Sequence, residues 1–142
     1  MFTFRRPTST AAPARALNVL VVDDEAPVRK FVDRVLRDGG YKTTVAGSGA
    51  EAIEAAARIE PLDLIVTDLM MPGMTGDELA RRLRHTVPGL KVLYLTGYSD
   101  RLFKEKVTLW DEEAFLDKPC SVQGLLEAVS LLAHGRLPAA TK

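Results

Sequence analysis

From Asn18 onward, short apolar runs alternate with amphipathic stretches, and a helix cap or a breaker residue marks each change. The first and third runs, over 18–22 and 62–67, are continuously apolar, which is typical of strands covered on both faces, as in a parallel sheet, whereas the second, over 42–45, is weaker. In all, the pattern predicts strands over 18–22, 42–45, 62–67, 91–95 and 113–116. The first amphipathic stretch has its apolar residues at helical spacing, namely Val28, Phe31, Val32, Val35 and Leu36.

Local signals predict where the helices begin and end. Pro27 suits the first turn of the first helix, and Gly39 with Gly40 ends it. Ser48 with Glu51 has the spacing of a capping box, and Pro61 is expected to end that second helix.

Three further helices complete the pattern. Thr75 with Glu78 repeats the capping-box spacing, and a fourth helix is expected over 100–110. Ser121 is expected to cap the last helix. The apolar stripe of that helix comprises Val122, Leu125, Leu126, Val129, Leu132 and Ala133.

Five strand and helix units in alternation predict an α/β fold, a right-handed, doubly wound parallel sheet of five strands with helices on both faces. Residues 17–135 are expected to form this single domain. Residues 1–16 mix Pro, Ser, Thr, Ala and Arg without periodicity, so we interpret them as a flexible leader or linker. Residues 136–142 form a C-terminal tail.

Composition narrows the class of protein. The chain of 142 residues is 46% apolar and 27% charged, as in soluble globular domains. Its net charge is zero, but the first sixteen residues hold three arginines and no acid, so the remainder is mildly acidic. This balance argues against nucleic-acid or membrane partners. Cys120 is the single cysteine, and neither a membrane-length apolar run nor a signal peptide is present, so we expect a cytoplasmic protein.

Candidate chemistry lies where the predicted strands end, because parallel sheets bind ligands beyond the carboxyl ends of their strands. Asp23, Asp24, Asp68, Thr96 and Lys118 follow or end four of the strands. Three converging carboxylates are stable mainly around a cation, and an oxygen-only site selects Mg²⁺ or Mn²⁺. Lys118 and Thr96 add donors suited to a phosphate, and a carboxylate can accept a phosphoryl group as nucleophile. Asp68, on the central strand, is the best placed.

Four pieces, in this order and spacing, carry a family resemblance: Val-Val-Asp-Asp-Glu at 21–25, Asp-Leu-Met-Met-Pro-Gly-Met-Thr-Gly at 68–76, Leu-Thr-Gly at 95–97 and Phe-Leu-Asp-Lys-Pro at 115–119. Residues 17–135 resemble the response regulator receiver domain of two-component signal transduction. They are similar to single-domain chemotaxis regulators and to receivers of hybrid histidine kinases. The resemblance implies a flavodoxin-like three-layer sandwich with strand order 2-1-3-4-5.

The resemblance also implies a set of roles for the site. Asp68 would be the phosphoacceptor, served by a sensor histidine kinase, a histidine phosphotransfer protein or a small phosphodonor. Mg²⁺ would be held by Asp23, Asp24, Asp68 and the main-chain carbonyl of Met70. Such a domain is a signalling switch that catalyses only its own phosphorylation and dephosphorylation.

The switch residues follow from the same resemblance. Thr96 would move toward the phosphoryl group, and Phe115 would rotate inward after it. Lys118 would pair with the phosphoryl group, and the bond from Lys118 to Pro119 is expected to be cis. The output partner is not specified by these motifs.

Some positions depart from the family pattern or extend it. Cys120 stands where the family often has an aromatic residue, and we interpret it as a small buried hydrophobe. Met70 and Tyr98 flank the site and are expected to restrict water and change the phosphoryl lifetime. The helix over 100–110 carries Phe103, Val107 and Trp110 on one stripe. Our hypothesis is that this stripe, with the fifth strand and last helix, forms a phosphorylation-sensitive face for a partner or a homodimer.

Other interpretations of these residues compete with this one. Asp23 and Asp24 could cap a helix. Gly47-Ser48-Gly49 imitates a dinucleotide fingerprint, but its preceding strand is the least hydrophobic of the five. A Mg²⁺-dependent aspartate-nucleophile phosphatase or a nucleotide-binding enzyme of related fold is the alternative. The phosphatase would need a second acid two residues after Asp68, where this chain has Met70.

Overall fold

The computed structural model describes residues 15–97 and 112–135. All five predicted strands and four of the predicted helices lie there. The helix expected over 100–110, with its apolar stripe, and Tyr98 lie outside the described residues. In chain order the elements are β1 (Asn18–Val22), α2 (Ala26–Asp38), β2 (Lys42–Ala46), α3 (Gly49–Ala56), β3 (Leu64–Asp68), α4 (Gly76–Arg84), β4 (Lys91–Thr96), β5 (Glu113–Asp117) and α6 (Val122–His134).

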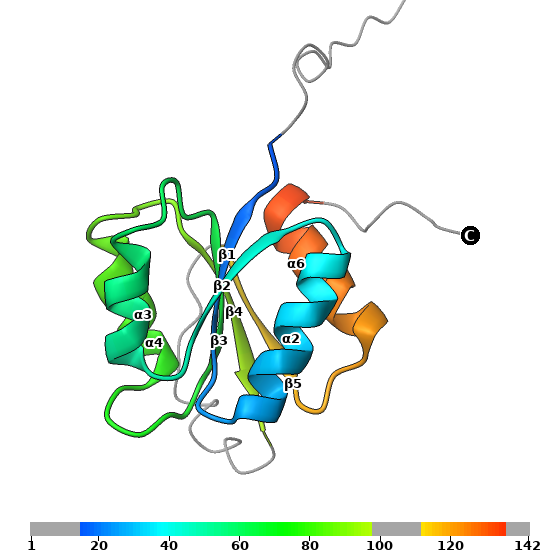
Figure 1. Cartoon of the computed structure of the whole chain (residues 1–142), viewed down its shortest axis with the longest axis horizontal. Helices are drawn as coiled ribbons and strands as arrows, with labels where there is room; N and C mark the ends of the chain where they lie inside the picture. The colour runs from blue at the N-terminus through cyan, green and yellow to red at the C-terminus, as the bar shows by residue number, and fades with distance from the viewer. Residues whose placement is uncertain (1–14, 98–111, 136–142) are drawn as a thin grey trace, which may run out of the picture.

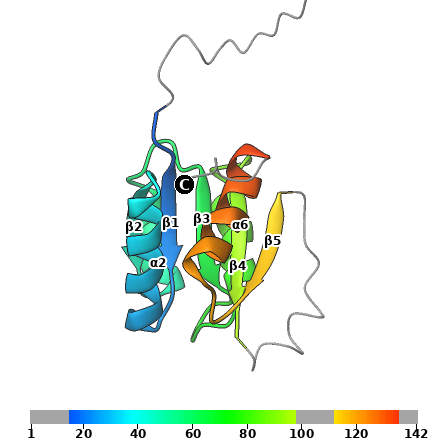
Figure 2. The same ribbon diagram turned by 90° about the vertical axis from the view of Figure 1, so that its right-hand side faces the viewer.

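The strands form one sheet in the order β2-β1-β3-β4-β5, and every neighbouring pair is parallel. Helices α3 and α4 cover one face, and α2 and α6 cover the other (Figure 1). The view turned by 90° shows the strand order directly, with α2 and α6 in front of the sheet (Figure 2). The predicted fold class and strand order are therefore confirmed.

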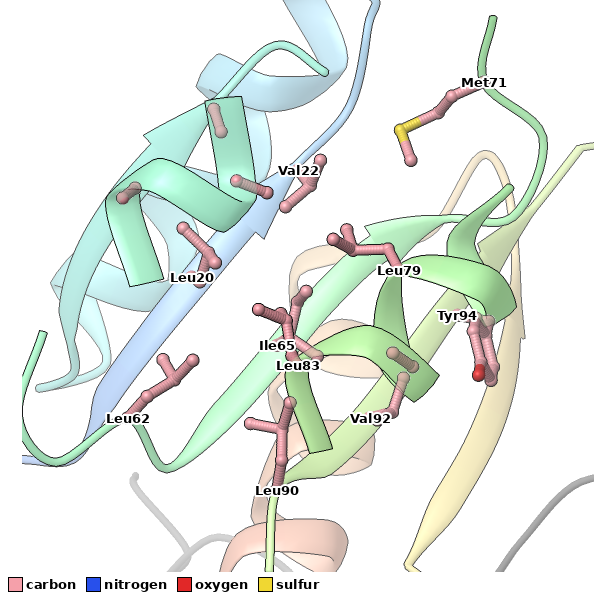
Figure 3. Packing of buried hydrophobic residues seen from close by; sticks show 14 of the residues in the cluster. Leu20, Val22, Leu62, Ile65, Met71, Leu79, Leu83, Leu90, Val92 and Tyr94 are labelled. Carbon is pink, nitrogen blue, oxygen red and sulfur yellow. The ribbon is translucent and has the colours of Figure 1, made fainter. Parts of the chain in front are cut away.

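The core lies on both faces of the sheet because successive strand residues point to opposite sides. In β1, Leu20 and Val22 face α3 and α4, whereas Val19 and Val21 face α2 and α6. Figure 3 shows the cluster on the α3 and α4 face. Its members include Ile65, Leu79, Leu83 and Val92, which pack between the sheet and these two helices. Strands buried on both sides explain the continuous apolar runs in the sequence.

The predicted helix caps are present, but the two glutamates of the capping boxes bond different partners. The Ser48 and Thr75 hydroxyls accept hydrogen bonds from the Glu51 and Glu78 amides, at 3.1 and 3.4 Å. The Glu51 carboxylate accepts from the Gly47 amide, whereas Glu78 pairs with Arg82. The Ser121 hydroxyl accepts from the Gly124 amide at 2.9 Å. These bonds satisfy amides that helix starts leave unpaired.

Two predicted boundaries are wrong. Helix α3 ends at Ala56, five residues before Pro61, because the amides of Arg58 and Ile59 bond three residues back and close tight turns instead of continuing the helix. Strand β3 runs over Leu64–Asp68 rather than from Leu62. Leu62 is buried in the core from the preceding loop.

Two members of the predicted apolar stripes are not core residues. Phe31 of α2 is 37% exposed and Val122 of α6 is 51% exposed, whereas Leu125 and Val129 are fully buried. Phe31 and Val122 line a groove between the two helices, so the apolar stripes extend past the buried interface. Within the described ranges, no helix is long and apolar enough to cross a membrane.

Candidate functional site

The predicted site residues gather at the carboxyl edge of the sheet. Asp23 follows β1, Asp68 ends β3, Thr96 ends β4 and Lys118 follows β5. Parallel pairing sets this arrangement, since Asp68 is in register with Leu95, and Thr96 with Asp117. The sheet order brings β1 and β3 side by side, so Asp23 and Asp68 become neighbours although 45 positions separate them in the chain.

Three carboxylates form one cluster at this edge. One oxygen each of Asp23, Asp24 and Asp68 lies within 4.8 Å of the others. Asp23 and Asp68 are buried, and Asp24 is exposed. Like charges this close repel one another, and burial strengthens the repulsion, so a bound cation would stabilise the cluster.

Lys118 supplies one positive charge to the cluster. Its Nζ lies 3.4 Å from Asp23 Oδ2, 3.4 Å from Asp68 Oδ1 and 3.8 Å from Glu25 Oε1. Burial lowers the pKa of the Lys118 ammonium, but the carboxylates of Asp23, Asp68 and Glu25 outweigh it, so the pKa lies above its usual range. The ammonium therefore stays charged near neutral pH.

Hydrogen bonds hold both the side chain and the backbone of Asp23. Its Oδ1 accepts a hydrogen bond from the Glu25 amide at 2.9 Å, and its carbonyl accepts one from Arg29 Nη1 at 2.7 Å. Burial raises the pKa of the Asp23 carboxyl, and the Glu25 hydrogen bond and the Lys118 charge offset this only in part. The residue at the N-cap of α2 is Glu25, with no side-chain cap, so helix capping does not account for Asp23 and Asp24.

The backbone at Asp68 depends on Gly76, which ends the 68–76 motif but for which the sequence alone suggested no role. The Gly76 amide donates to the Leu69 carbonyl at 2.7 Å. A Cβ at position 76 would lie 2.3 Å from the Asp68 carbonyl oxygen. Only glycine allows the first turn of α4 to approach β3 this closely. Arg29 was also missed, because its bond to the Asp23 carbonyl depends on a tertiary approach that no spacing rule encodes.

A cavity of about 800 Å³ opens onto the cluster. Its polar side comprises Asp24, Glu25, Asp68 and Lys118, and Met70 and Gly97 lie at its wall. Met70 is 41% exposed there. The remaining wall is formed by Pro27, Val28, Phe31, Pro119 and Cys120. The bond from Lys118 to Pro119 is cis, as predicted.

Cys120 belongs to the apolar wall. It is half-buried and packs against the core cluster on the α2 and α6 face. Burial raises the pKa of its thiol. A protonated thiol is the form expected of a small packing residue rather than of a reactive nucleophile.

Thr96 and Phe115 lie near the site but outside the cavity lining. Thr96 is buried, and its hydroxyl donates to Asp117 Oδ1 at 2.9 Å. Phe115 is half-buried and packs against Tyr94, with ring centroids 5.7 Å apart. The structure therefore brings Asp23, Asp24, Asp68 and Lys118 together and gives the Thr96 hydroxyl a different partner.

The donor set fits a hard divalent cation. The cluster offers carboxylate oxygens alone, without histidine or thiolate, and this is the set that Mg²⁺ and Mn²⁺ prefer. Asp24 is exposed, so water can reach the cluster, in keeping with the tendency of Mg²⁺ to keep part of its hydration. Lys118 supplies one positive charge against three carboxylates, so negative charge remains for such an ion.

Known proteins resemble the chain over nearly all of its folded part. The family model for the response regulator receiver domain matches residues 19–130. The sensor kinase CckA of Brucella abortus is 37% identical over 112 residues, which cover 78% of this chain but 12% of that protein. The response regulator receiver protein CpdR of the same species is 32% identical over 78% of this chain and 92% of its own length. The chain spans about half or less of several other curated relatives.

Solved structures agree with these matches. A response regulator receiver protein from Sinorhizobium medicae superposes with a TM-score of 0.74 at 30% identity, covering 85% of this chain and 97% of that one. The receiver domain of the hybrid histidine kinase CckA gives a TM-score of 0.69 at 29% identity, covering 82% and 99%. The chain therefore belongs to the response regulator receiver domain family of two-component systems.

Proposed function

We propose that this receiver domain accepts a phosphoryl group on Asp68 from the phosphohistidine of a sensor kinase or phosphotransfer protein. The observation that carries the proposal is the juxtaposition at one cavity of the Asp68 carboxylate, two further carboxylates and the Lys118 ammonium. A carboxylate beside a fixed ammonium can attack phosphorus while the ammonium balances charge on the transferring oxygens.

The reaction is a displacement at phosphorus. One Asp68 oxygen forms a P–O bond as the P–N bond to the donor histidine breaks, and the imidazole nitrogen leaves with the electron pair and takes up a proton. Lys118 exchanges its contact with the Asp68 carboxylate for the arriving phosphoryl oxygens. Asp23 and Asp24, Asp68 and the main-chain carbonyl of Met70 would hold Mg²⁺, which supplies charge neutralisation between the carboxylates and the phosphoryl group.

The consequence of phosphorylation would be a change of surface. In this proposal Thr96 turns its hydroxyl to the phosphoryl group, and Phe115 follows by rotating inward. Residues 17–135 act as a cytoplasmic switch for a partner, either as a stand-alone protein or within a longer chain. In this proposal Met70, which lies at the cavity wall, limits the approach of water and so sets the lifetime of the phosphoryl group. Tyr98, the residue after Gly97 in the sequence, is proposed to act in the same way.

The test is phosphorylation by a small acyl or amide phosphodonor in the presence of Mg²⁺. We expect intact-protein mass spectrometry to show one base-labile phosphoryl adduct and peptide mapping to place it at Asp68. Asp68→Asn should abolish the adduct. Asp63→Asn is the matched control, since Asp63 precedes the same strand at the opposite edge of the sheet.

An adduct that survives Asp68→Asn, or one mapped to another residue, would overturn the assignment of Asp68. Steady turnover of the phosphodonor or of unrelated phosphate esters, without a stable adduct, would favour a phosphatase instead.

A further inference from the structure

The Thr96 hydroxyl already has an acceptor in the structure. It donates to Asp117 Oδ1 at 2.9 Å, across the ends of β4 and β5. Thr96 is 2% exposed, so its hydroxyl lies in a setting where hydrogen-bond partners are few. Asp117 is exposed, so water can solvate its carboxylate if the bond breaks.

The position of Asp117 is fixed by the sheet. Thr96 and Asp117 are cross-strand partners, and Tyr94 and Phe115 are the partners two residues earlier on the same face. The Lys118 amide donates to the Thr96 carbonyl at 2.8 Å, which anchors the register beyond the last pair. The hydroxyl and the carboxylate therefore meet directly above the packed rings of Tyr94 and Phe115.

A hydroxyl has one proton to donate, so Thr96 can serve one strong acceptor at a time. A bond to a carboxylate is charge-assisted and stronger than one to a neutral oxygen. We propose that Asp117 is a positioning residue that holds the Thr96 hydroxyl in the unphosphorylated orientation and competes for it with the phosphoryl group on Asp68. This inference rests on the proposed function. It names the contact that favours the unphosphorylated orientation of Thr96.

The competition has a defined energetic consequence. Removing the Asp117 acceptor lowers the free energy needed to turn the Thr96 hydroxyl away from β5. It therefore raises the population of the competent form, in which this hydroxyl is available to a phosphoryl group. A charge-assisted bond with one exposed partner corresponds to roughly a five- to tenfold change in the equilibrium. The same factor should appear in the apparent affinity for any phosphoryl mimic, because affinity scales with the competent fraction.

The experiment is a titration with beryllofluoride in the presence of Mg²⁺, followed by calorimetry and by two-dimensional NMR. We expect Asp117→Ala to bind the mimic about five- to tenfold more tightly than the wild type. Asp117→Asn keeps an acceptor oxygen without the charge and should lie closer to the wild type. Glu127→Gln, which removes a charge that pairs with Gln123 on α6, should leave the affinity unchanged.

A double-mutant cycle separates competition from a merely structural effect. Thr96→Val removes the hydroxyl, so Asp117→Ala should have no further effect on the affinity in that background. Thr96→Ser keeps a hydroxyl, so the effect of Asp117→Ala should be present again. Thermal unfolding of each variant confirms that it is folded.

Three results would overturn the inference: an unchanged affinity in Asp117→Ala, the same gain in the Thr96→Val background, or equal gains for the Asn and Ala variants. The last would mean that charge near Lys118, rather than the hydrogen bond, carries the effect. If the wild type itself neither binds the mimic nor accepts a phosphoryl group, the proposed function fails as well, and the two failures are thereby distinguished.

Discussion

At the scale of single residues, the phosphoacceptor candidate depends on a glycine eight positions away in the sequence. Gly76→Ala would place a Cβ 2.3 Å from the Asp68 carbonyl, so backbone must shift. We expect a loss of about 1–3 kcal/mol in the free energy of unfolding, as for other overpacked sites. Urea denaturation measures it. Gly89→Ala is the control, because nothing lies within 4 Å of its added Cβ, and equal midpoints for both variants would contradict the argument.

The site residues that the sequence could predict are those whose positions follow from the order of the strands. Asp23, Asp68 and Lys118 could be placed together because each follows or ends a strand of one parallel sheet. The partner of the Thr96 hydroxyl could not be predicted, because it depends on the side-chain rotamer that turns the hydroxyl toward Asp117 at the end of β5. The contact of Arg29 with the Asp23 carbonyl likewise arises only after α2 has docked on the sheet.

At the scale of elements, an ion pair joins the end of α4 to the start of β5. Arg84 and Glu113 lie 2.9 Å apart, with side chains only 12% and 4% exposed, and Arg84 also donates to the Leu90 carbonyl. Arg84→Ala leaves a buried carboxylate without this partner, which costs about 3–5 kcal/mol. We expect chemical denaturation to show a loss of this order.

The same helix offers the control for that prediction. Arg82 pairs with Glu78 at 2.8 Å, but the two side chains are 56% and 42% exposed. Solvent and salt screen such a pair, so Arg82→Ala should cost about 1 kcal/mol or less. If the two variants were equally stable, burial would not be the feature that gives the Arg84 pair its importance.

Element types were predictable from the sequence because burial on both faces leaves continuous apolar runs, and caps mark the helix starts. Boundaries were less so. Pro61 was expected to end α3, yet the chain leaves the helix at Ala56 by tight turns that the apolar spacing does not encode. The exposed Phe31 and Val122 show the same limit, since helical spacing marks a face but not how far the neighbouring helix covers it.

At the scale of the whole molecule, the two edges of the sheet hold their carboxylates differently. At the amino edge, Asp63 accepts two hydrogen bonds from Arg15, at 2.8 and 2.7 Å, and one from the Asn18 amide at 2.7 Å. The hydrogen bond from Arg15 lowers the pKa of Asp63 below its usual 3.8, and the Asn18 amide adds to this against the opposing effect of burial. Asp63 therefore stabilises the fold through its ionised form.

This edge predicts a dependence of stability on pH. A carboxyl with a lowered folded pKa contributes stability that is present above its unfolded pKa and lost as the pH falls through the folded one. We expect Asp63→Asn to be less stable than the wild type at neutral pH, and the gap to close as the pH falls below about 4. Thermal unfolding across this range measures it. Asp38→Asn, in an exposed pair on α2, should show little gap throughout, and a constant gap for Asp63→Asn would refute the linkage.

The carboxyl edge has the opposite character, because its carboxylates are stable together only with added positive charge. Lys118 contacts Asp23, Glu25 and Asp68, so Asp24→Asn relieves repulsion without removing any of these ion pairs. We expect this variant to unfold at a higher temperature than the wild type without Mg²⁺. It should gain less stability from Mg²⁺, which would stabilise the wild type by about 2.7 kcal/mol at one hundred times its dissociation constant.

Thermal unfolding with and without Mg²⁺ measures both effects, with Asp63→Asn as the variant that should keep the full gain. If Mg²⁺ stabilised Asp24→Asn as much as the wild type, Asp24 would not be part of the metal site, and the remaining carboxylates would have to hold the ion alone.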